Sequence, residues 1–221
     1  MSTLSGGPNI VTDGLVLYLD AANVKSYVSG STTWADISGN GRNGTLTNGP
    51  TYSSANGGNI VFDGSNKRAI LTTPFGQSGF TTVSTWYNRV EGSSSTTWRT
   101  LLATTSTNVH HLISQDPSRV LGLWDGSFRS FGYTPLIDGK FHNYTVIYQS
   151  GINATLYVDG IFISTITIVL NLTTSPIGSI GNWNSGNYWV GNIAQTLIYN
   201  RALSAQEILQ NYNATKTRFG L

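Results

Sequence analysis

The sequence predicts an all-β protein built as an antiparallel sandwich or barrel. Charged residues make up 10% of the 221-residue chain, against roughly 25% in an average soluble domain. Helices usually draw on Glu, Lys, Ala and Leu, whereas this chain contains only two glutamates and few lysines. It is instead rich in Thr, Val, Ile and aromatic residues and is interrupted by 25 glycines. That composition is typical of β-sheet proteins.

The predicted strands follow one another along nearly the whole chain. The first is Gly14-Leu-Val-Leu-Tyr-Leu-Asp20, and a long loop over residues 21–59 follows it. Their spacing favours a sandwich or barrel over alternating strands and helices. The further predicted strands cover residues 60–63, 68–73, 80–89, 99–104, 109–114, 119–124, 141–149, 154–159, 161–168, 176–180 and 188–199.

Asp-Gly dipeptides mark several of the turns between these strands, because glycine readily adopts the positive φ that a tight turn needs. They occur at residues 125–126, 138–139 and 159–160. Asp159-Gly160 gives the clearest prediction of a two-residue hairpin. Five of the eight aspartates precede a glycine, so most of the acid in this chain is assigned to turns.

One helix is predicted, close to the C-terminus. Ser204 and Glu207 have the spacing of a capping box, in which each side chain accepts a hydrogen bond from the backbone amide of the other residue. Ala205, Ile208 and Tyr212 follow at helical spacing and predict a short apolar face that packs on the sandwich.

The chain is predicted to form a single domain over residues 13–221, preceded by a flexible polar arm over residues 1–12. No secretory signal and no apolar run of about 18 residues is present, so we expect a soluble protein without a membrane insertion. The absence of cysteine excludes disulfides and thiolate chemistry. Basic residues are spread singly apart from Lys67-Arg68, which argues against a nucleic-acid partner.

Several segments resemble one family when taken in order. Asp138-Gly-Lys-Phe-His-Asn-Tyr-Thr-Val146 followed by Ala154-Thr-Leu-Tyr-Val-Asp-Gly160 is similar to a strand pair of laminin-G-like domains in the concanavalin A-like lectin/glucanase superfamily. The C-terminal segment over residues 191–208 resembles the last strand and helix of that family. Further similar segments are residues 14–20, 34–44 and 60–64.

This resemblance implies a jelly-roll sandwich of two curved antiparallel sheets with one short C-terminal helix. The opening strand, the loop at residues 36–41 and the Phe-Gly-Leu ending look most like versions carried by bacteriophage virion proteins, such as tail fibres, capsid fibres and decoration proteins. The resemblance therefore implies a virion location and a homo-oligomer such as a trimer. Its implied partners are other virion proteins, contacted through the N-terminal arm, and cell-surface glycans.

The acidic residues argue against an enzyme. Retaining glycosidases place two carboxyl groups about 5–5.5 Å apart, which on a strand requires acidic residues two positions apart. The sequence has no such pair, because Glu91 stands at a strand end and Glu207 is assigned to the helix cap. A glycoside hydrolase is kept only as the least favoured alternative.

One loop has the spacing of a calcium-binding segment. Asp36, Ser38 and Asn40 place oxygen atoms at relative positions 1, 3 and 5 with a glycine at position 6. Asn43 follows in the same loop, and Asp63 is a candidate ligand from outside it. Members of the resembled family often carry a structural calcium, although Lys67 and Arg68 stand where the family tends to have an acidic residue. The alternative is a plain loop held by Asx turns.

The three histidines are assigned structural roles. His110 and His111 are neighbours on a predicted strand, so their side chains face opposite sides. His142 lies where the resembled family has a packed histidine, and no carboxylate stands at metal-ligand spacing from any of the three.

The aromatic residues offer a candidate binding surface. Strand residues such as Trp86 and Trp124 are expected in the core. The loop Asn182-Trp-Asn-Ser-Gly-Asn-Tyr-Trp189 carries large aromatics among Gly and Asn, and binding functions concentrate on such loops. Trp183, Tyr188 and Trp189 are therefore the predicted ligand-binding residues, with the alternative that they only cover the rim of the core. The aromatics that could contribute to sugar stacking are Trp86, Tyr87, Trp98, Trp124, Tyr133, Trp183, Tyr188 and Trp189.

Together these observations predict a non-enzymatic virion protein with a lectin-like module that binds glycans. A capsid decoration protein without a ligand is the main alternative.

Overall fold

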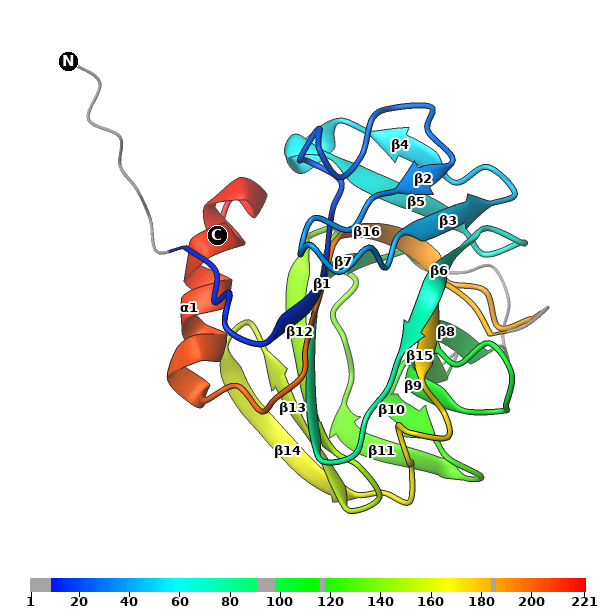
Figure 1. Ribbon diagram of the computed structural model, residues 1–221, viewed down its shortest axis with the longest axis vertical. Coiled ribbons are helices and arrows are strands. Elements are labelled where there is room, and N and C mark those ends of the chain that lie inside the picture. The colour runs from blue at the N-terminus through cyan, green and yellow to red at the C-terminus, as the bar shows by residue number, and fades with distance from the viewer. Residues whose placement is uncertain (1–8, 91–97, 116–117, 184–185) are drawn as a thin grey trace.

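Two antiparallel β-sheets pack face to face in the computed structural model, which describes residues 9–90, 98–115, 118–183 and 186–221 (Figure 1). Sheet A has the order β14-β13-β12-β7-β16-β5-β4, with β1 also paired to β16. Sheet B has the order β11-β10-β9-β8-β15-β6-β3-β2. The predicted all-β sandwich with one C-terminal α-helix is confirmed.

The strands of sheet A are β1 (Leu15–Asp20), β4 (Thr51–Ser53), β5 (Asn59–Asp63), β7 (Phe80–Arg89), β12 (His142–Gln149), β13 (Asn153–Val158), β14 (Ile161–Thr167) and β16 (Val190–Tyr199). The strands of sheet B are β2 (Thr33–Trp34), β3 (Gly44–Thr47), β6 (Arg68–Phe75), β8 (Trp98–Ala103), β9 (His110–Gln115), β10 (Leu121–Trp124), β11 (Phe128–Tyr133) and β15 (Ile177–Ile180). The helical segments are η1 (Ala55–Gly57), α1 (Ala205–Thr215) and η2 (Lys216–Phe219).

The strand predictions differ from the structure in two places. The predicted loop over residues 21–59 contains β2, β3 and β4. These strands are too short to show an alternation of apolar and polar residues in the sequence. The sequence patterns also do not predict β11, whose residues include Arg, Ser and Gly. The hairpin at Asp159-Gly160 is confirmed, since both residues have positive φ and Val158 pairs with Ile161 across the turn.

The main core lies between the two sheets and is rich in aromatic rings. Tyr87 on β7 stacks on Tyr144 of β12 with ring centroids 4.1 Å apart, and Trp189 meets Tyr87 edge-on at 4.8 Å. All three side chains are buried. Such offset and edge-to-face pairs add to the stability that burial of their area provides.

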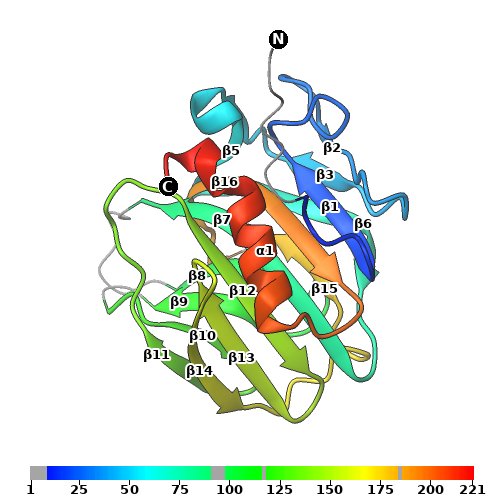
Figure 2. The same ribbon diagram turned by 90° about the vertical axis from the view of Figure 1, so that its left-hand side faces the viewer.

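A second, smaller core lies between sheet A and the C-terminal helical segments, which cross the outer face of that sheet (Figure 2). Trp86 points outward from β7, stacks on Phe219 at 4.3 Å and donates a hydrogen bond from Nε1 to Thr215. Trp86 is buried as predicted, but beneath the helix instead of between the sheets. No helix among the described residues is long and apolar enough to cross a membrane.

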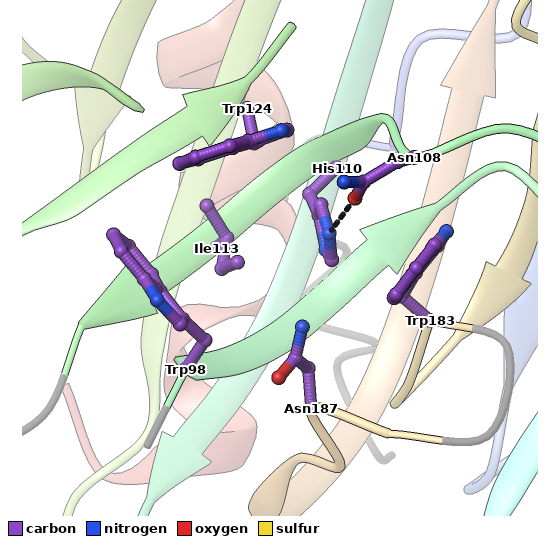
Figure 3. Close-up of a pocket in the computed structure, with 7 residues that line it drawn as sticks. All are labelled: Trp98, Asn108, His110, Ile113, Trp124, Trp183 and Asn187. Carbon is purple, nitrogen blue, oxygen red and sulfur yellow. Dashed lines mark hydrogen bonds between the residues drawn. The ribbon is translucent and has the colours of Figure 1, made fainter. Parts of the chain in front are cut away.

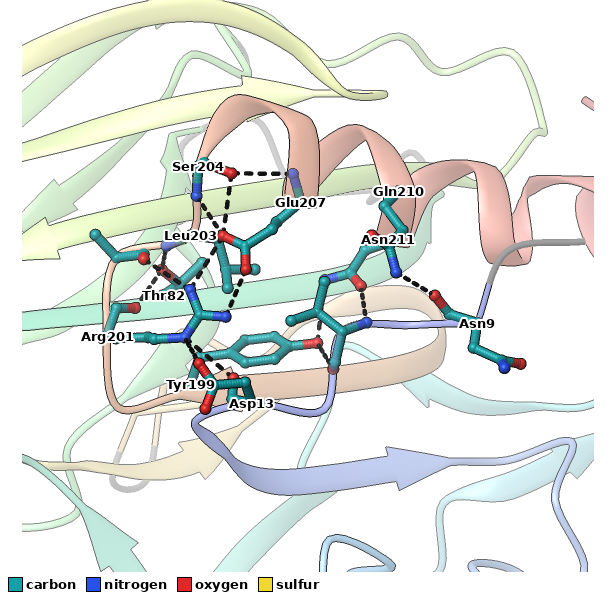
Figure 4. Close-up of polar contacts among 12 residues, drawn as sticks. Asn9, Asp13, Thr82, Tyr199, Arg201, Leu203, Ser204, Glu207, Gln210 and Asn211 are labelled. Atoms are coloured by element: carbon teal, nitrogen blue, oxygen red, sulfur yellow. Dashed lines mark hydrogen bonds and ion pairs between the residues drawn. The ribbon is translucent and has the colours of Figure 1, made fainter.

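The predicted capping box at the start of α1 is present. Ser204 Oγ accepts from the amide of Glu207 at 3.3 Å, and Glu207 Oε2 accepts from the amide of Ser204 at 2.8 Å. Arg201 extends this arrangement, because its guanidinium pairs with Glu207 at 2.6 Å and with Asp13 at 2.8 Å (Figure 4). The cap thereby ties the helix to the N-terminal segment.

Residues 9–12 belong to the folded domain, which corrects the boundary predicted for the flexible arm. Val11 is buried, its amide donates to Asn211 Oδ1 of α1 at 2.8 Å, and its carbonyl accepts from the Tyr199 hydroxyl at 2.9 Å. Gln210 donates to the carbonyl of Asn9 (Figure 4). The correction arises because a single apolar residue and two backbone groups suffice to dock this segment. The remainder of the predicted arm, residues 1–8, lies outside the described residues.

We expect Asn211→Ala to destabilise the protein by about 1–3 kcal/mol, because it leaves the buried amide of Val11 without its acceptor. Chemical unfolding of the variant and the parent protein measures this difference. Gln206→Ala, on the exposed side of the same helix, is the matched control and should change stability by less than about 0.5 kcal/mol. Equal stability of the two variants would contradict a stabilising role for the hydrogen bond between Val11 and Asn211.

The Glu207 carboxylate should make stability depend on acid pH. The hydrogen bond from Arg201, together with that from the Ser204 amide, lowers the pKa of Glu207 from its ordinary 4.5 to about 2. A lowered folded-state pKa contributes stability above the unfolded pKa, and this is lost as pH falls towards the folded value. Glu207→Gln keeps a cap acceptor but loses the charge, so we expect a loss of about 0.5–1 kcal/mol at pH 7.

Urea unfolding between pH 6 and pH 2 tests this expectation. The difference between the parent protein and Glu207→Gln should shrink as pH falls from about 4.5 to 2. A difference that stays constant over that range would contradict an ionic contribution.

Candidate functional site

A pocket lined by three tryptophans opens on the outer face of sheet B. Its volume is about 180 Å³. We call it the tryptophan pocket, and its lining residues are Trp98, Asn108, His110, Ile113, Trp124, Trp183 and Asn187. Figure 3 shows the three indoles around a central Ile113 and His110, with the two asparagines between them. The arrangement offers aromatic walls with polar groups at intervals.

Three strands and two loops position these side chains. Trp98 begins β8, His110 and Ile113 lie on β9, and Trp124 ends β10. Asn108 comes from the loop between β8 and β9, and Trp183 and Asn187 come from the loop between β15 and β16. The alternation of side chains along a strand sends His110 into the pocket and His111 into the core, where His111 Nε2 donates to the Ser175 carbonyl at 2.8 Å. The prediction that the two histidines face opposite sides is confirmed.

The indole rings are held in place while remaining partly accessible. Trp98 packs edge-on against Trp124 with centroids 5.9 Å apart and also contacts Phe128 at 4.9 Å. Trp183 packs near the His110 ring at 5.1 Å and donates from Nε1 to the Thr107 carbonyl at 2.7 Å. All three tryptophans are half-buried. The Trp183 N–H is thus satisfied within the protein, and its ring is left for contact with a ligand.

His110 is neutral at physiological pH and organises the polar side of the pocket. Burial, with a smaller effect from nearby His111, lowers the pKa of His110 to about 4. Its Nδ1 lies 2.6 Å from Thr100 Oγ1 and its Nε2 lies 3.1 Å from Asn108 Oδ1. A neutral ring has one donor and one acceptor, so the Thr100 hydroxyl donates to Nδ1 and Nε2–H donates to Asn108. This orients the Asn108 NH₂ group away from the ring.

Two amides in the pocket keep hydrogen-bonding capacity for a ligand. Within the described part of the chain, the Asn108 NH₂ group and the Asn187 side chain have no hydrogen-bond partner, and the residues that line the pocket carry no charge. Asn187 has a positive φ of 52°, and its carbonyl accepts from the Thr100 amide at 2.8 Å. That backbone bond fixes the loop against β8.

The structure separates the three predicted ligand-binding residues. Trp183 lines the pocket. Tyr188 is half-buried and does not line it, and its carbonyl accepts from Arg99 at 3.2 Å. Trp189 is fully buried in the main core, so its ring cannot contact a ligand. The reason is that the Trp189 ring packs edge-on against Tyr87 between the two sheets.

The structure also changes the assignment of the strand tryptophans. Trp124, expected in the core, is half-buried and lines the pocket. Trp98 belongs to the broader set of candidate stacking residues, whereas Asn108 and Asn187 are not singled out by the sequence. Trp98 and Trp124 stand at strand ends beside polar loops, and that position is the signal that could have separated them from core residues.

The predicted calcium loop is held together by its own hydrogen bonds. Asp36 Oδ1 accepts from the amides of Tyr18 and Ser38, and Oδ2 accepts from the Ser38 hydroxyl and the Arg42 amide, all within 2.8–3.0 Å. Asn43 Oδ1 accepts from the Asp36 amide, and Asn40 donates to Ser38 Oγ. These bonds have the form of the alternative Asx-turn loop.

Asp63, the predicted ligand from outside the loop, pairs instead with Lys67 at 3.4 Å and accepts from the Ser65 amide. Over residues 9–90, 98–115, 118–183 and 186–221, no three acidic or histidine side chains gather in a way that could hold a metal ion. Calcium binding stays a prediction.

His142 forms a structural ion-pair group with two aspartates, Asp138 and Asp159. His142 Nδ1 lies 2.7 Å from Asp159 Oδ2, and Nε2 lies 3.4 Å from Asp138. The hydrogen bond to Asp159 raises the pKa of His142. His142 thus joins the Asp138-Gly139 and Asp159-Gly160 turns, in line with the packed role predicted for it. Glu91 lies outside the described residues.

Comparison with known proteins now defines the class. A family model described as the concanavalin A-like lectin/glucanases superfamily, of the Laminin_G_3 type, matches residues 62–209. The chain belongs to this family. No curated protein sequence matches it.

Several solved structures share the fold. Trypanosoma rangeli sialidase, in complex with the inhibitor DANA, superposes with a TM-score of 0.69 at 16% identity over 99% of this chain and 36% of the sialidase. Domain 4 of AbnA, a GH43 extracellular arabinanase from Geobacillus stearothermophilus in complex with arabinotriose, gives 0.69 at 16% identity over 90% and 98%. The binding domain of botulinum neurotoxin DC in complex with SialylT gives 0.69 at 15% identity over 92% and 52%. The chain therefore spans about a third of the sialidase and about half of the toxin domain.

We expect Asp36→Ala to lower stability by about 1–3 kcal/mol in the presence of EDTA, because four donors lose their acceptor. Asp63→Ala, which removes only a surface ion pair and a turn contact, should cost less than about 1 kcal/mol. Chemical unfolding compares the two. A loss from Asp36→Ala that appears only when calcium is added would contradict the hydrogen-bonded loop. A rise in Tm with millimolar calcium that either variant abolishes would establish the predicted cation site.

Proposed function

We propose that this protein is a non-enzymatic glycan-binding module that takes a sugar ring into the tryptophan pocket. The observation that carries the proposal is the pocket itself, in which three partly accessible indoles surround two amides with free hydrogen-bonding groups. Sites of this kind, with mostly apolar walls and a few convergent polar groups, are the usual form of small-ligand sites.

The chemistry of the pocket fits an uncharged sugar. The apolar C–H face of a sugar ring can stack on an indole, which provides a large flat apolar area. Its hydroxyls can accept from the Asn108 NH₂ group and exchange hydrogen bonds with Asn187. His110 is neutral because its pKa is lowered to about 4, so it neither attracts nor repels a charged ligand at neutral pH. The pocket volume of about 180 Å³ is smaller than the roughly 300–1,000 Å³ of sites for drug-sized molecules, as expected for one ring.

One observation favours binding over hydrolysis, and a second supports a glycan as the ligand. The seven residues that line the pocket include no carboxylate, whereas most glycosidases act through a pair of them. The fold is also shared with an arabinanase domain in complex with arabinotriose and with a toxin binding domain in complex with SialylT. At 15–16% identity these relatives support the fold, and the pocket residues of this chain support the ligand class.

The proposal includes a setting. On the sequence resemblance of its opening strand, loop and C-terminal ending, we place the module on the surface of a phage capsid or tail, as part of a homo-oligomer such as a trimer. There it would contact cell-surface glycans. A decoration protein without a ligand is the second candidate, and localisation of the chain in a purified particle tests the setting for both.

We expect Trp98→Ala and Trp124→Ala each to weaken glycan binding at least about tenfold, because buried tryptophan contacts dominate most binding sites. A glycan array identifies the ligand, and calorimetry measures the affinity. Phe162→Ala removes an exposed aromatic side chain on sheet A and is the matched control, with unchanged affinity.

Three results would count against the proposal. An array without binding favours the decoration protein, and equal affinity of the tryptophan variants and the control places the ligand elsewhere. Release of sugar products from a polysaccharide would show hydrolase activity.

A further inference from the structure

A second hollow lies on the outer face of sheet B, outside the tryptophan pocket. Its volume is about 230 Å³. It is lined by Arg68 and Ile70 of β6, Ser179 of β15 and Thr105 of the β8–β9 loop. We call it the β6 hollow. Its lining combines hydroxyl groups, a guanidinium and one aliphatic side chain.

Strand register places both hollows in one line across the sheet. Trp124 pairs with His110, His110 with Ala103, Ala103 with Ser179, and Ser179 with Ile70. Side chains directly opposite one another in an antiparallel pair point to the same face. The row therefore begins with two residues of the tryptophan pocket and ends with two residues of the β6 hollow. Ala103 lies between them and is fully buried.

The inner face of the same strands confirms the orientation. Leu102 pairs with Ile180, and both belong to the core between the sheets, as do Ala69 and Leu71 on either side of Ile70. Ile70 and Ser179 therefore face outward. Neighbouring strands lie about 4.8 Å apart, so the four steps from β10 to β6 span roughly 19 Å.

The two hollows share their walls. The β8–β9 loop contributes Asn108 to the tryptophan pocket and Thr105 to the β6 hollow. On the other side, Trp183 lines the tryptophan pocket, while the preceding Asn182 accepts at Oδ1 from Ser179 of the β6 hollow at 2.5 Å. The Trp183 N–H joins the two loops through the Thr107 carbonyl. One pair of loops thus borders both sites.

From this register we infer that the β6 hollow is a second sugar subsite, and that the ligand is an oligosaccharide running across the strands of sheet B. The inference rests on the proposed function of the tryptophan pocket. One ring stacks between the indoles. A later residue of the same chain lies over Ile70, accepts hydrogen bonds from the Arg68 guanidinium and exchanges hydrogen bonds with the exposed Thr105 hydroxyl. A ligand that spans two subsites gains affinity from the second contact without a second association.

The test compares affinity with chain length. Calorimetry is performed with arabinose and with linear arabino-oligosaccharides of two to four residues, and with the glycan that the array selects and its shorter fragments. In the parent protein we expect at least a tenfold gain from the single sugar to the longest chain. Ile70→Ala and Arg68→Ala should reduce this gain severalfold and leave the single sugar unaffected. Thr45→Ala, which pairs with Ile70 on the next strand but does not line the hollow, should change neither.

Trp98→Ala separates this inference from the proposal on which it rests, because it should weaken binding at every chain length. Equal affinity for all lengths, or a length dependence that both β6 variants retain, overturns the second subsite while binding in the tryptophan pocket stands. The absence of binding to any glycan overturns the proposed function and the second subsite together. Thermal melts of each variant show that its fold is intact.

Discussion

The packing of two sheets through their inner faces is the constraint on which the rest of the structure depends. The inward-facing side chains, including the stacked Tyr87 and Tyr144, form the core between the sheets. The two outer faces differ in whether the helix covers them. Sheet A is covered by α1 and η2, which bury Trp86. On sheet B the tryptophan pocket and the β6 hollow lie on the outer face. The position of the helix thereby decides which face is available to a ligand.

The low charge of the chain extends to the tryptophan pocket, which is lined by aromatic rings, amides and one isoleucine. Recognition there depends on indole faces and amides, and the one titratable residue, His110, is kept neutral by burial. Its two ring nitrogens serve to hold Thr100 and Asn108 in place. A site of this kind has little dependence on salt or on pH near neutrality, because no ionic contact is made or lost.

The N-terminal segment and the C-terminal part of the chain contact each other. Asp13, Arg201 and Glu207 form one ionic group, and Val11 exchanges hydrogen bonds with Asn211 and Tyr199. Some of the charges in this chain thus join segments that are distant in sequence, as Arg201–Asp13 and Arg218–Asp20 do. The same is true of His142, which joins two Asp-Gly turns. The Val11–Asn211 hydrogen bond adds to the apolar packing that holds α1 against the outer face of sheet A.

The sequence by itself determined the elements that depend on local rules. Alternation and turn residues predicted most strands and the Asp159-Gly160 hairpin, the spacing of Ser204 and Glu207 predicted the helix cap, and neighbouring positions on one strand separated His110 from His111. Only the tertiary structure decided which outward-facing side chains meet. Trp124 joined the pocket and Trp189 joined the core, although both are tryptophans in β-rich segments. Local patterns alternate along one strand, whereas a pocket depends on the register between strands and on which face a helix covers.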